Sequence, residues 1–293
     1  MSEPHLTIGM IGLGNMGLPM SARLLQAGHR VLGFDLSPEN LSAFSARGGT
    51  PAESVGGVTE DIDLLILMLP SSDIVENVLL EQGVAARMPE GAVVVDMSSS
   101  VPGRTKDLAE RLRTGFGVRL VDAPVSGGVK GAVAGTLTIM VGGVDEDVAV
   151  VRPALEAMGR LVRTGPVASG HALKALNNLL SATHLLVTSE ALHVGTRFGM
   201  DPEVMLEAIN GASGRSGSTE NKWPNFVVPQ TYDSGFSLAL MVKDMKIARE
   251  LAHDVGLGTP LADRAVELWE QAAGELPQDA DHTEIARWSA LRQ

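Results

Sequence analysis

The sequence predicts an α/β fold in the first half of the chain and an all-helical fold in the second half, joined by one long helix. Short apolar runs alternate with helical segments up to about residue 165, which is typical of a parallel sheet with helices on both faces. From about Gly170 onward no convincing strand pattern follows. We therefore expect two domains, 1–165 and 166–293.

The composition supports two packed domains and narrows the class of partner. The chain has 293 residues, of which 44% are hydrophobic, so ordinary cores can form. Its 23 basic and 35 acidic residues give a net charge of −12, and an acidic surface repels a phosphate backbone. We expect no nucleic-acid partner, while a local basic pocket for one small anion stays open.

The absence of cysteine excludes disulfides, thiolate catalysis and cysteine-ligated metals. Residues 1–5 are polar, and the apolar run Leu6–Gly17 is short and holds four glycines, a poor pattern for a signal peptide. Other apolar runs, such as Leu64–Leu69, fall far below the ~20 residues that span a bilayer. We expect a cytoplasmic protein without a membrane partner.

Six apolar runs predict the strands of the first half. Leu64–Leu69 is uninterrupted and bounded by Asp63 and Pro70, as expected of a strand covered on both faces. A helix from Leu18 to Ala27 follows the first run. The predicted strands are Leu6–Ile11, His29–Asp35, Leu64–Leu69, Ala92–Met97, Arg119–Asp122 and Leu137–Val141.

The first predicted strand ends in the turn Gly12-Leu13-Gly14-Asn15-Met16-Gly17, which opens the first predicted helix. In a dinucleotide-binding turn the first glycine permits the bend, the second admits a pyrophosphate and the third lets helix and strand pack closely. Unpaired N–H groups at the helix start then face the anion. A glycine-rich turn alone can lack a ligand, but its place between a strand and a helix favours a Rossmann dinucleotide-binding domain.

Asp35 ends the second predicted strand, 18 residues after Gly17. A carboxylate at that place can accept hydrogen bonds from both ribose hydroxyls of a dinucleotide. It would also repel a 2′-phosphate, and the next residue is Leu36 rather than arginine. The sequence therefore favours NAD, with NADP as the alternative because Arg23 and Arg30 are nearby in sequence.

The stretch 170–198 predicts one long helix that is apolar on nearly every face. A helix that is apolar all round is buried on all sides. We expect it to connect the two domains and to pair subunits in a homodimer or homotetramer. Further helices are predicted at 202–210, 238–255 and 259–273, the first with Asp201 as its N-cap and Pro202 at its first position.

Four motifs occur in order along almost the whole chain. They are Gly12–Gly17, Asp122–Gly128, Gly170–Asn178 and Lys243-Asp244. Together they resemble the four signatures of the β-hydroxyacid dehydrogenases, a family that includes 3-hydroxyisobutyrate dehydrogenase and tartronate semialdehyde reductase. The resemblance implies a Rossmann domain, an all-helical C-terminal domain, and reversible hydride transfer between NAD(P) and the hydroxyl-bearing β-carbon of a small 3-hydroxy acid.

Lys174 and Asn178 are four residues apart and therefore share one face of the long helix. A helical lysine alone is usually solvated, but Lys174 lies among Leu173, Ala175 and Leu176, where a charge is costly unless it lines a cleft. Burial lowers the pKa of a lysine toward neutrality, as proton transfer at pH 7 requires. The resemblance implies that Lys174 is the general acid and base, and that Asn178 holds the substrate oxygen and orients the lysine.

The segment Ser126-Gly127-Gly128 follows a predicted strand and offers a hydroxyl and flexible backbone N–H groups, which suits a carboxylate cradle or an ordinary turn. The resemblance implies the cradle and places Ser126 among the catalytic residues. It further implies that Lys243 reaches the cofactor and substrate, that Leu69-Pro70 flanks the adenosine, and that Ser99 lies near the nicotinamide.

The segment Ser213–Trp223 matches the family only loosely. Several members place a large aromatic residue near the position of Gly217, so a smaller residue here indicates a roomier substrate site. Arg215 could meet a second anionic group there, or it could be a surface residue of a glycine- and serine-rich loop. The seven histidines show no metal-binding spacing, so no metal is expected.

The resulting hypothesis is a dehydrogenase for a small carboxylate substrate. Imine reductases share this architecture but generally lack the lysine, so Lys174 argues against that activity. A nucleotide-sensing or structural Rossmann protein would have no reason to keep Lys174 buried beside Asn178. Both alternatives stay open to the sequence alone.

Overall fold

The structure is a computed structural model that describes residues 5–291. The chain folds into two compact units, Met1–Lys174 and Ala175–Gln293. Helix α7 (Ser169–Phe198) passes through this division, so its start belongs to the first unit and the remainder to the second. Each unit has hydrophobic clusters of its own.

The first unit is built on one nine-stranded sheet. Its strands are β1 (Thr7–Ile11), β2 (Arg30–Phe34), β3 (Thr50–Pro51), β4 (Leu64–Leu67), β5 (Val93–Asp96), β6 (Arg119–Asp122), β7 (Val125–Ser126), β8 (Leu137–Gly142) and β9 (Gly159–Gly165). The order is β3-β2-β1-β4-β5-β6-β8-β7, with β9 also paired to β8. The chain order reverses between β1 and β4, where open α/β sheets form a crevice for ligands.

Strands β1 to β6 pair in parallel, as predicted, but β8 runs antiparallel to β6 and β7. The prediction of a wholly parallel sheet is therefore wrong at this edge. The chain turns back through β7, which itself pairs antiparallel with β8, so β8 enters from the opposite end of the sheet. Strand β9 was not predicted, because its apolar centre is only Leu161 and Val162, between Arg160 and Arg163.

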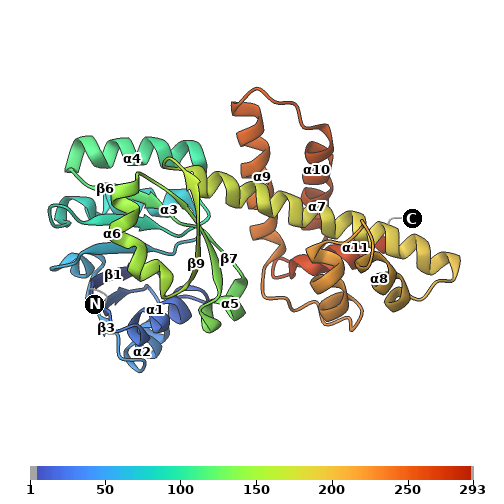
Figure 1. Cartoon of the computed structure of the whole chain (residues 1–293), viewed down its shortest axis with the longest axis horizontal. Coiled ribbons are helices and arrows are strands. Elements are labelled where there is room, and N and C mark those ends of the chain that lie inside the picture. Colours follow the sequence, from blue (N-terminus) through green and yellow to red (C-terminus); the bar gives the residue numbers. More distant parts are fainter. Residues whose placement is uncertain (1–4, 292–293) are drawn as a thin grey trace. The chain divides into compact units, whose positions relative to one another are not determined.

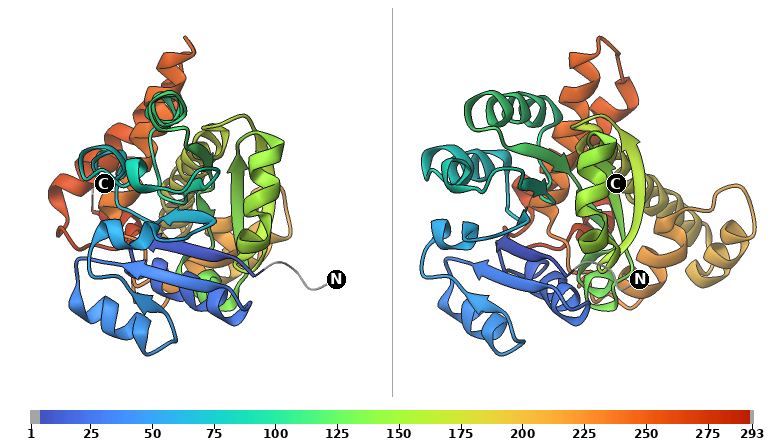
Figure 2. Two further views of the ribbon diagram at one scale, coloured as in Figure 1. Left: turned by 90° about the vertical axis from the view of Figure 1, so that its left-hand side faces the viewer. Right: turned by 60° about the vertical axis from the view of Figure 1, so that its left-hand side comes forward.

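Helices cover both faces of this sheet (Figures 1 and 2). The helices are α1 (Gly17–Gln26), α2 (Pro38–Ser45), α3 (Ser72–Glu76), α4 (Pro102–Phe116), α5 (Gly128–Ala134) and α6 (Asp145–Glu156), with the shorter segments η1 (Val55–Thr59), η2 (Asn77–Glu81) and η3 (Ala85–Arg87). One core contains residues of α1, α2, α5 and α6, and the other contains residues of η1, α3 and α4.

The strand β4 shows why both faces need helices. Leu64 and Ile66 belong to the same core as Met20 of α1, whereas Leu65 and Leu67 belong to the core of Leu112 in α4. Successive side chains of a strand point to opposite faces, so an uninterrupted apolar run requires a hydrophobic partner on each side. The prediction that this strand is covered on both faces is confirmed.

The second unit is helical. Its elements are the remainder of α7, α8 (Pro202–Asn210), the π-helical η4 (Ser218–Val227), α9 (Leu238–Asp254), α10 (Pro260–Glu275), η5 (His282–Glu284) and α11 (Ile285–Ala290). Within described residues 175–291 the β-structure is one isolated bridge between Ser237 and Asp281. The prediction of an all-helical second half is confirmed, although η4 and α11 were not predicted. Asp201 caps α8 as predicted, because its side chain accepts a hydrogen bond from the Glu203 N–H.

The long helix α7 is not buried on all sides within a single chain. Leu185 and Leu192 lie in the core of the second unit, but Leu180, Val187 and Val194 are 58%, 54% and 64% exposed. One face of the helix therefore has no cover from its own unit, and the expected pairing of subunits along this helix stays a prediction. Among the described helices, none has the length and apolar character required to cross a membrane.

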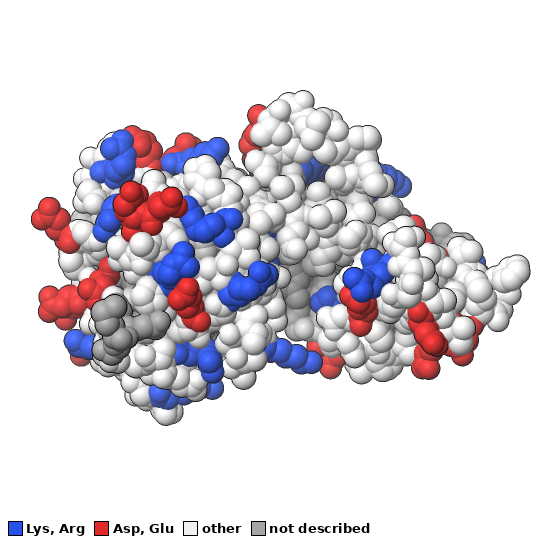
Figure 3. Space-filling model, in the orientation of Figure 1, with Lys and Arg blue, Asp and Glu red and all other residues white. Residues whose placement is uncertain are grey.

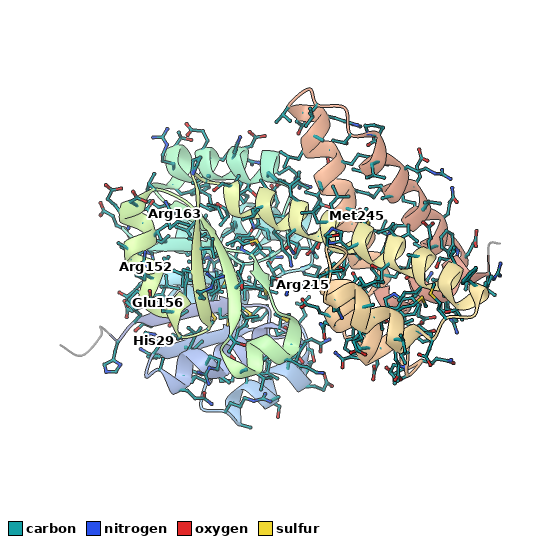
Figure 4. The ribbon with its side chains drawn as sticks, turned by 45° about the vertical axis from the view of Figure 1, so that its right-hand side comes forward. His29, Arg152, Glu156, Arg163, Arg215 and Met245 are labelled. Atoms are coloured by element: carbon teal, nitrogen blue, oxygen red, sulfur yellow. The ribbon has the colours of Figure 1, made fainter. Side chains whose placement is uncertain are left out.

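Charged side chains of both signs are interspersed over the face drawn in Figure 3. Part of this mixing comes from ion pairs within the first unit, such as Arg152 with Glu156 at 3.1 Å and Arg163 with Asp145 at 2.7 Å. Figure 4 labels Arg152, Glu156 and Arg163 on α6 and the neighbouring β9. Exposed pairs of this kind contribute little to stability, about 0–1 kcal/mol each.

Candidate active site

The three glycines of the turn Gly12–Gly17 have different surroundings. Gly12 has φ +96°, and a Cβ there would lie 2.2 Å from the carbonyl oxygen of Met68. A Cβ on Gly17 would lie 1.9 Å from the carbonyl oxygen of Gly12, whereas a Cβ on Gly14 meets no described atom within 4 Å. The fold therefore requires Gly12 and Gly17, and the space beside Gly14 is open in the way that an approaching pyrophosphate needs.

Asp35 follows β2 and ties the glycine-rich turn to the next loop. Its Oδ2 accepts a hydrogen bond from the Leu13 N–H at 2.7 Å. Its Oδ1 accepts from the Ser37 N–H at 2.8 Å and from Asn40 Nδ2 at 3.1 Å. A carboxylate has about four acceptor positions. About one is left for a ribose hydroxyl, fewer than the two bonds expected from the sequence.

The ends of β4 and β5 lie side by side and carry three predicted cofactor residues. The Leu69 N–H donates to Ser98 Oγ at 3.0 Å, which joins Leu69-Pro70 to the segment after β5. Ser98 and Ser100 are buried and donate to the Asp96 carboxylate, through the Ser98 N–H at 3.0 Å and Ser100 Oγ at 2.7 Å. Ser99, between them, is only half-buried, so it is the serine of this segment whose side chain a ligand could reach.

The predicted carboxylate cradle lies at the end of β7. Ser126 is half-buried, and Gly127 and Gly128 are exposed with φ values of +133° and +61°. L-amino acids with side chains rarely adopt these angles, so the sequence at this turn is restricted to glycine by its backbone. The Met140 N–H donates to the Pro124 carbonyl at 3.0 Å and fixes the entry to the turn against β8.

Lys174 is buried although the nearest leucines in sequence are exposed. Its exposed fraction is 9%, whereas Leu173 and Leu176 are 40% and 41% exposed. Asn178 is 5% exposed and follows one helical turn later on the continuous helix α7, as predicted. An ordinary surface helix would expose the lysine and bury the leucines. The helix therefore buries its polar pair on a face where apolar residues would be expected.

Asn178 is anchored by a carboxylate from α9. Its Nδ2 donates to Asp244 Oδ2 at 2.6 Å, and its Oδ1 accepts from Asn177 Nδ2 at 3.1 Å. Asp244 is 2% exposed, and Lys243 Nζ lies 3.3 Å from its other oxygen. Met245, labelled in Figure 4, is fully buried next to Asp244. These contacts fix which side of the Asn178 amide carries the N–H donors.

Arg215 lies in the segment between α8 and η4 (Figure 4). Its side chain is 63% exposed, and its Nε lies 3.7 Å from Glu220 Oε1. This loose surface pair leaves the guanidinium in contact with solvent. The suggested role of Arg215 in binding a second anionic group stays a prediction.

Among residues 5–291 no group of three or more histidine, aspartate or glutamate side chains is arranged to hold a metal ion. Asp281 and His282 form a hydrogen-bonded titratable cluster in the second unit. Asp281 accepts from Ser234 Oγ at 2.9 Å and from the Gly235 and Phe236 N–H groups. Burial, with a further contribution from the charge of Lys222, lowers the pKa of His282 to about 4.

Two family models match the chain in succession. The NAD binding domain of 6-phosphogluconate dehydrogenase matches residues 7–167, and the NAD-binding domain of NADP-dependent 3-hydroxyisobutyrate dehydrogenase matches residues 168–289. The 3-hydroxyisobutyrate dehydrogenase of Pseudomonas aeruginosa is 39% identical over 284 residues, which cover 94% of each chain. The chain belongs to the β-hydroxyacid dehydrogenase family.

Two other proteins extend this comparison. The 2-(hydroxymethyl)glutarate dehydrogenase of Eubacterium barkeri is 38% identical over 92% of this chain and 89% of its own length. A solved structure of 3-hydroxyisobutyrate dehydrogenase from Mycobacterium tuberculosis with L-serine has a TM-score of 0.91 at 31% identity, covering 99% of this chain and 100% of its own. The protein is thus an NAD(P)-dependent hydroxyacid dehydrogenase.

Three buried residues of this β-hydroxyacid dehydrogenase lie in the family motifs, but the sequence alone assigned them no role. They are Asp122, His171 and Asp244, each at most 2% exposed. A signal for Asp244 was available in the helical period, because Met241, Asp244 and Met245 share one face and that face is buried. Asp122 and His171 gave no such signal, since their partners come from distant segments.

Proposed function

We propose that this dehydrogenase transfers a hydride reversibly between NAD and the primary alcohol carbon of a 2-substituted 3-hydroxypropionate. Lys174 is the general acid and base of the proposed reaction. The observation that carries the proposal is the burial of Lys174 between exposed leucines on a chain that also has an open dinucleotide turn. A lysine is rarely held out of water unless its charge is paired or used.

The proposed substrate class follows from the chemistry that the relatives' names share. 3-Hydroxyisobutyrate, 2-(hydroxymethyl)glutarate and L-serine are all HO–CH₂–CH(R)–COO⁻, with R a methyl, a carboxyethyl or an ammonium group. The common part is a primary alcohol one carbon away from a carboxylate. A site that fixes the carboxylate and the alcohol oxygen would accept this class, and the surroundings of R would select among its members.

Each group of residues has a separate role in the proposed reaction. When bound, the nicotinamide supplies the hydride acceptor or donor. Lys174 takes the hydroxyl proton during oxidation and returns it to the carbonyl oxygen during reduction. Asn178 uses one N–H on Asp244 and offers the second to the substrate oxygen, while Ser126-Gly127-Gly128 binds the carboxylate through a hydroxyl and backbone N–H groups.

The proposed cofactor is NAD rather than NADP. The Asp35 carboxylate would repel a 2′-phosphate, and the neighbouring Leu36 is 90% exposed and brings no positive charge. Arg23 is engaged elsewhere, since its guanidinium donates to Ala157 O at 3.5 Å and Gln26 Oε1 at 3.0 Å. Arg30 begins the five-residue strand that Asp35 follows, about 16 Å away at ~3.3 Å per residue.

Further cofactor contacts are proposed for residues whose roles rest on family membership. Leu69-Pro70 would flank the adenosine and the half-buried Ser99 the nicotinamide. Lys243, whose side chain is 29% exposed, would reach the cofactor and substrate. We also propose that the functional boundary lies at 165/166, so that the whole of α7 belongs to the helical domain.

A homodimer or homotetramer is proposed from the exposed face of α7. Leu176, Leu180, Val187 and Val194 are 41%, 58%, 54% and 64% exposed and are spaced by four, seven and seven residues, so they form one stripe. A second copy of the same stripe is the simplest cover for it, because a two-fold interface uses the same patch on both subunits. Sedimentation of Leu180→Glu/Val187→Glu against the unaltered protein tests this: a shift toward the monomer is expected.

The test of the function is a coupled panel of cofactors and alcohols. The protein is mixed with NAD⁺ or NADP⁺ and with 3-hydroxyisobutyrate, L-serine, 2-(hydroxymethyl)glutarate or a 2-hydroxy acid, and reduced cofactor is followed by its absorbance. Turnover is expected with NAD⁺ and at least one member of the 3-hydroxypropionate class, and none with the 2-hydroxy acid. Reduction of cyclic imines without any alcohol oxidation would contradict the proposal.

A further inference from the structure

The carboxylate of Asp122 joins the end of β6 to the beginning of α7. Asp122 is fully buried, and its Oδ1 accepts a hydrogen bond from the Ala168 N–H at 2.6 Å. Its Oδ2 accepts from the His171 N–H at 2.9 Å. Both donors are at the start of the helix, where N–H groups lack partners within the helix. A negative charge there is also favoured by the helix dipole.

The surrounding backbone is shaped around this carboxylate. A Cβ on Gly142 would lie 2.4 Å from Asp122 Oδ1, and a Cβ on Gly170 would lie 2.8 Å from Asp122 Oδ2 and 2.3 Å from the Met140 carbonyl oxygen. Ala168, which donates the shorter bond, has φ +76°, a conformation that residues with a Cβ rarely adopt. Two glycines and one strained alanine therefore surround the buried Asp122 side chain. An ordinary helix N-cap does not need such surroundings.

The side chain of His171 holds the same helical turn from a second direction. Its Nδ1 lies 2.9 Å from Thr105 Oγ1, and its Nε2 lies 3.7 Å from Asp96 Oδ2. Asp96 is itself held by Ser98 and Ser100, next to the predicted nicotinamide contact Ser99. The start of α7 is thus fixed to the end of β6 through Asp122 and to α4 through the hydrogen bond between His171 and Thr105.

We propose that Asp122 is a positioning residue that sets Lys174 relative to the Ser126 cradle. Lys174 follows His171 by three residues, about 4.5 Å along the helix axis. Ser126 follows Asp122 by four residues along the chain. The Asp122 side chain therefore connects two parts of the proposed site. It lies just before the segment that would bind the substrate carboxylate, and it holds the start of the helix that carries Lys174. This inference rests on the proposed role of Lys174.

An asparagine cannot take over this role, although it has the same shape. The carboxylate accepts one N–H on each oxygen, whereas the amide of Asp122→Asn offers one acceptor and turns its NH₂ group toward the other donor. The start of α7 then loses one of its two backbone bonds and shifts. Reaction geometry is sensitive to displacements of about 1 Å, which can cost about 10²-fold in rate.

The experiment compares Asp122→Asn with Asp147→Asn in the full-length enzyme. Asp147 is a matched control, because it is also a buried carboxylate of the first unit, paired with Arg119 at 2.6 Å, and it belongs to α6 rather than to α7 or the cradle. For Asp122→Asn we expect kcat to fall at least tenfold, NADH affinity to stay within twofold, and the acidic limb of the pH profile for alcohol oxidation to move. Asp147→Asn is expected to lower Tm while kcat stays within twofold.

A milder variant keeps the test decisive if Asp122→Asn does not fold. Thr105→Val removes the hydrogen bond to His171, together with the bond from Thr105 Oγ1 to the Val101 carbonyl at the start of α4, and is expected to lower kcat about threefold with unchanged NADH affinity. The proposal is overturned if Asp122→Asn, or Thr105→Val in its place, keeps full kcat, or if Asp147→Asn loses as much kcat for the same drop in Tm. Full turnover by Lys174→Ala would instead overturn the proposed mechanism and this inference together.

Discussion

The dinucleotide turn and the lysine-bearing helix are positioned by different kinds of contact. In the turn, Gly17 packs on Gly12 five residues earlier, and Leu13 bonds to Asp35 at the end of the next strand. On α7, Asn178 is held by Asp244, which lies 66 residues away. The first region is built from contacts that are close in sequence, and the second from contacts that only the folded chain brings together.

This difference determines how each region responds to substitution. A larger side chain in the turn clashes with the backbone, so a substitution there mainly lowers the stability of the fold. A polar substitution on α7 or on its partners removes a hydrogen bond that orients a side chain of the site. It therefore mainly lowers catalysis, while most of the packing is kept. The predictions below separate stability from turnover, beginning with the largest expected effect.

Lys174→Ala is expected to reduce kcat by about 10³-fold, because general acid–base catalysis contributes about 10²–10⁴-fold to a rate. NADH affinity, measured by fluorescence titration, should not change. Lys246→Ala is the control, since Lys246 is half exposed and forms a surface pair with Glu270 at 2.6 Å. Loss of NADH binding in Lys174→Ala would assign the lysine to the cofactor and contradict the acid–base role.

Gly17→Ala and Gly14→Ala should separate the two functions of the glycine-rich turn. A Cβ at Gly17 meets the Gly12 carbonyl oxygen at 1.9 Å, so urea denaturation should show a loss of about 3 kcal/mol or more. A Cβ at Gly14 meets no described atom within 4 Å, so Tm should not change while the Kd for NAD⁺ rises about tenfold. Unchanged NAD⁺ affinity in Gly14→Ala would mean that the pyrophosphate does not approach this glycine.

The stability of the second unit should depend on pH through His282. Its folded pKa of about 4 lies below the unfolded value of 6.5, so the unfolded chain binds the proton first as the pH falls. This contribution is complete above pH 6.5 and is lost between pH 6.5 and 4, with about 3 kcal/mol as an upper value. Asp281, whose pKa is lowered by hydrogen bonds with Thr283 against the raising effect of burial, acts only below about pH 4.

The measurement is urea unfolding at pH 7 and pH 5, followed by circular dichroism. His282→Asn should flatten the dependence between these two values, because asparagine does not titrate. His253→Asn should leave it unchanged, since the His253 side chain is 61% exposed. Equal slopes for the unaltered protein and His282→Asn would remove His282 as the cause.

Asp244→Asn should reduce kcat about tenfold. An amide at position 244 can both donate and accept a hydrogen bond, so it can pair with either side of the Asn178 amide. Part of the population then presents the Asn178 carbonyl instead of its N–H to the substrate. Asp254→Asn, an exposed position of the same helix α9, serves as the control. A double-mutant cycle with Asn178→Ala should be non-additive, and additive effects would show that the two residues act independently.

The sequence by itself determined the features that depend on local periodicity and backbone geometry. The strand–turn–helix around Gly12–Gly17, the doubly covered strand at Leu64–Leu67 and the cap at Asp201 were all predicted, because each follows from residues close together in the chain. The one-turn spacing of Lys174 and Asn178 belongs to the same class, since a helix imposes it.

Only the tertiary structure decided which side chains hold that helix in place. Asp122 and Asp244 lie 49 and 66 residues from the groups that they bind, and periodicity carries no signal over such separations. The antiparallel entry of β8 was mispredicted for the same reason. A pattern reports whether a residue prefers burial, whereas the partner that buries it is chosen by the packing of the whole chain.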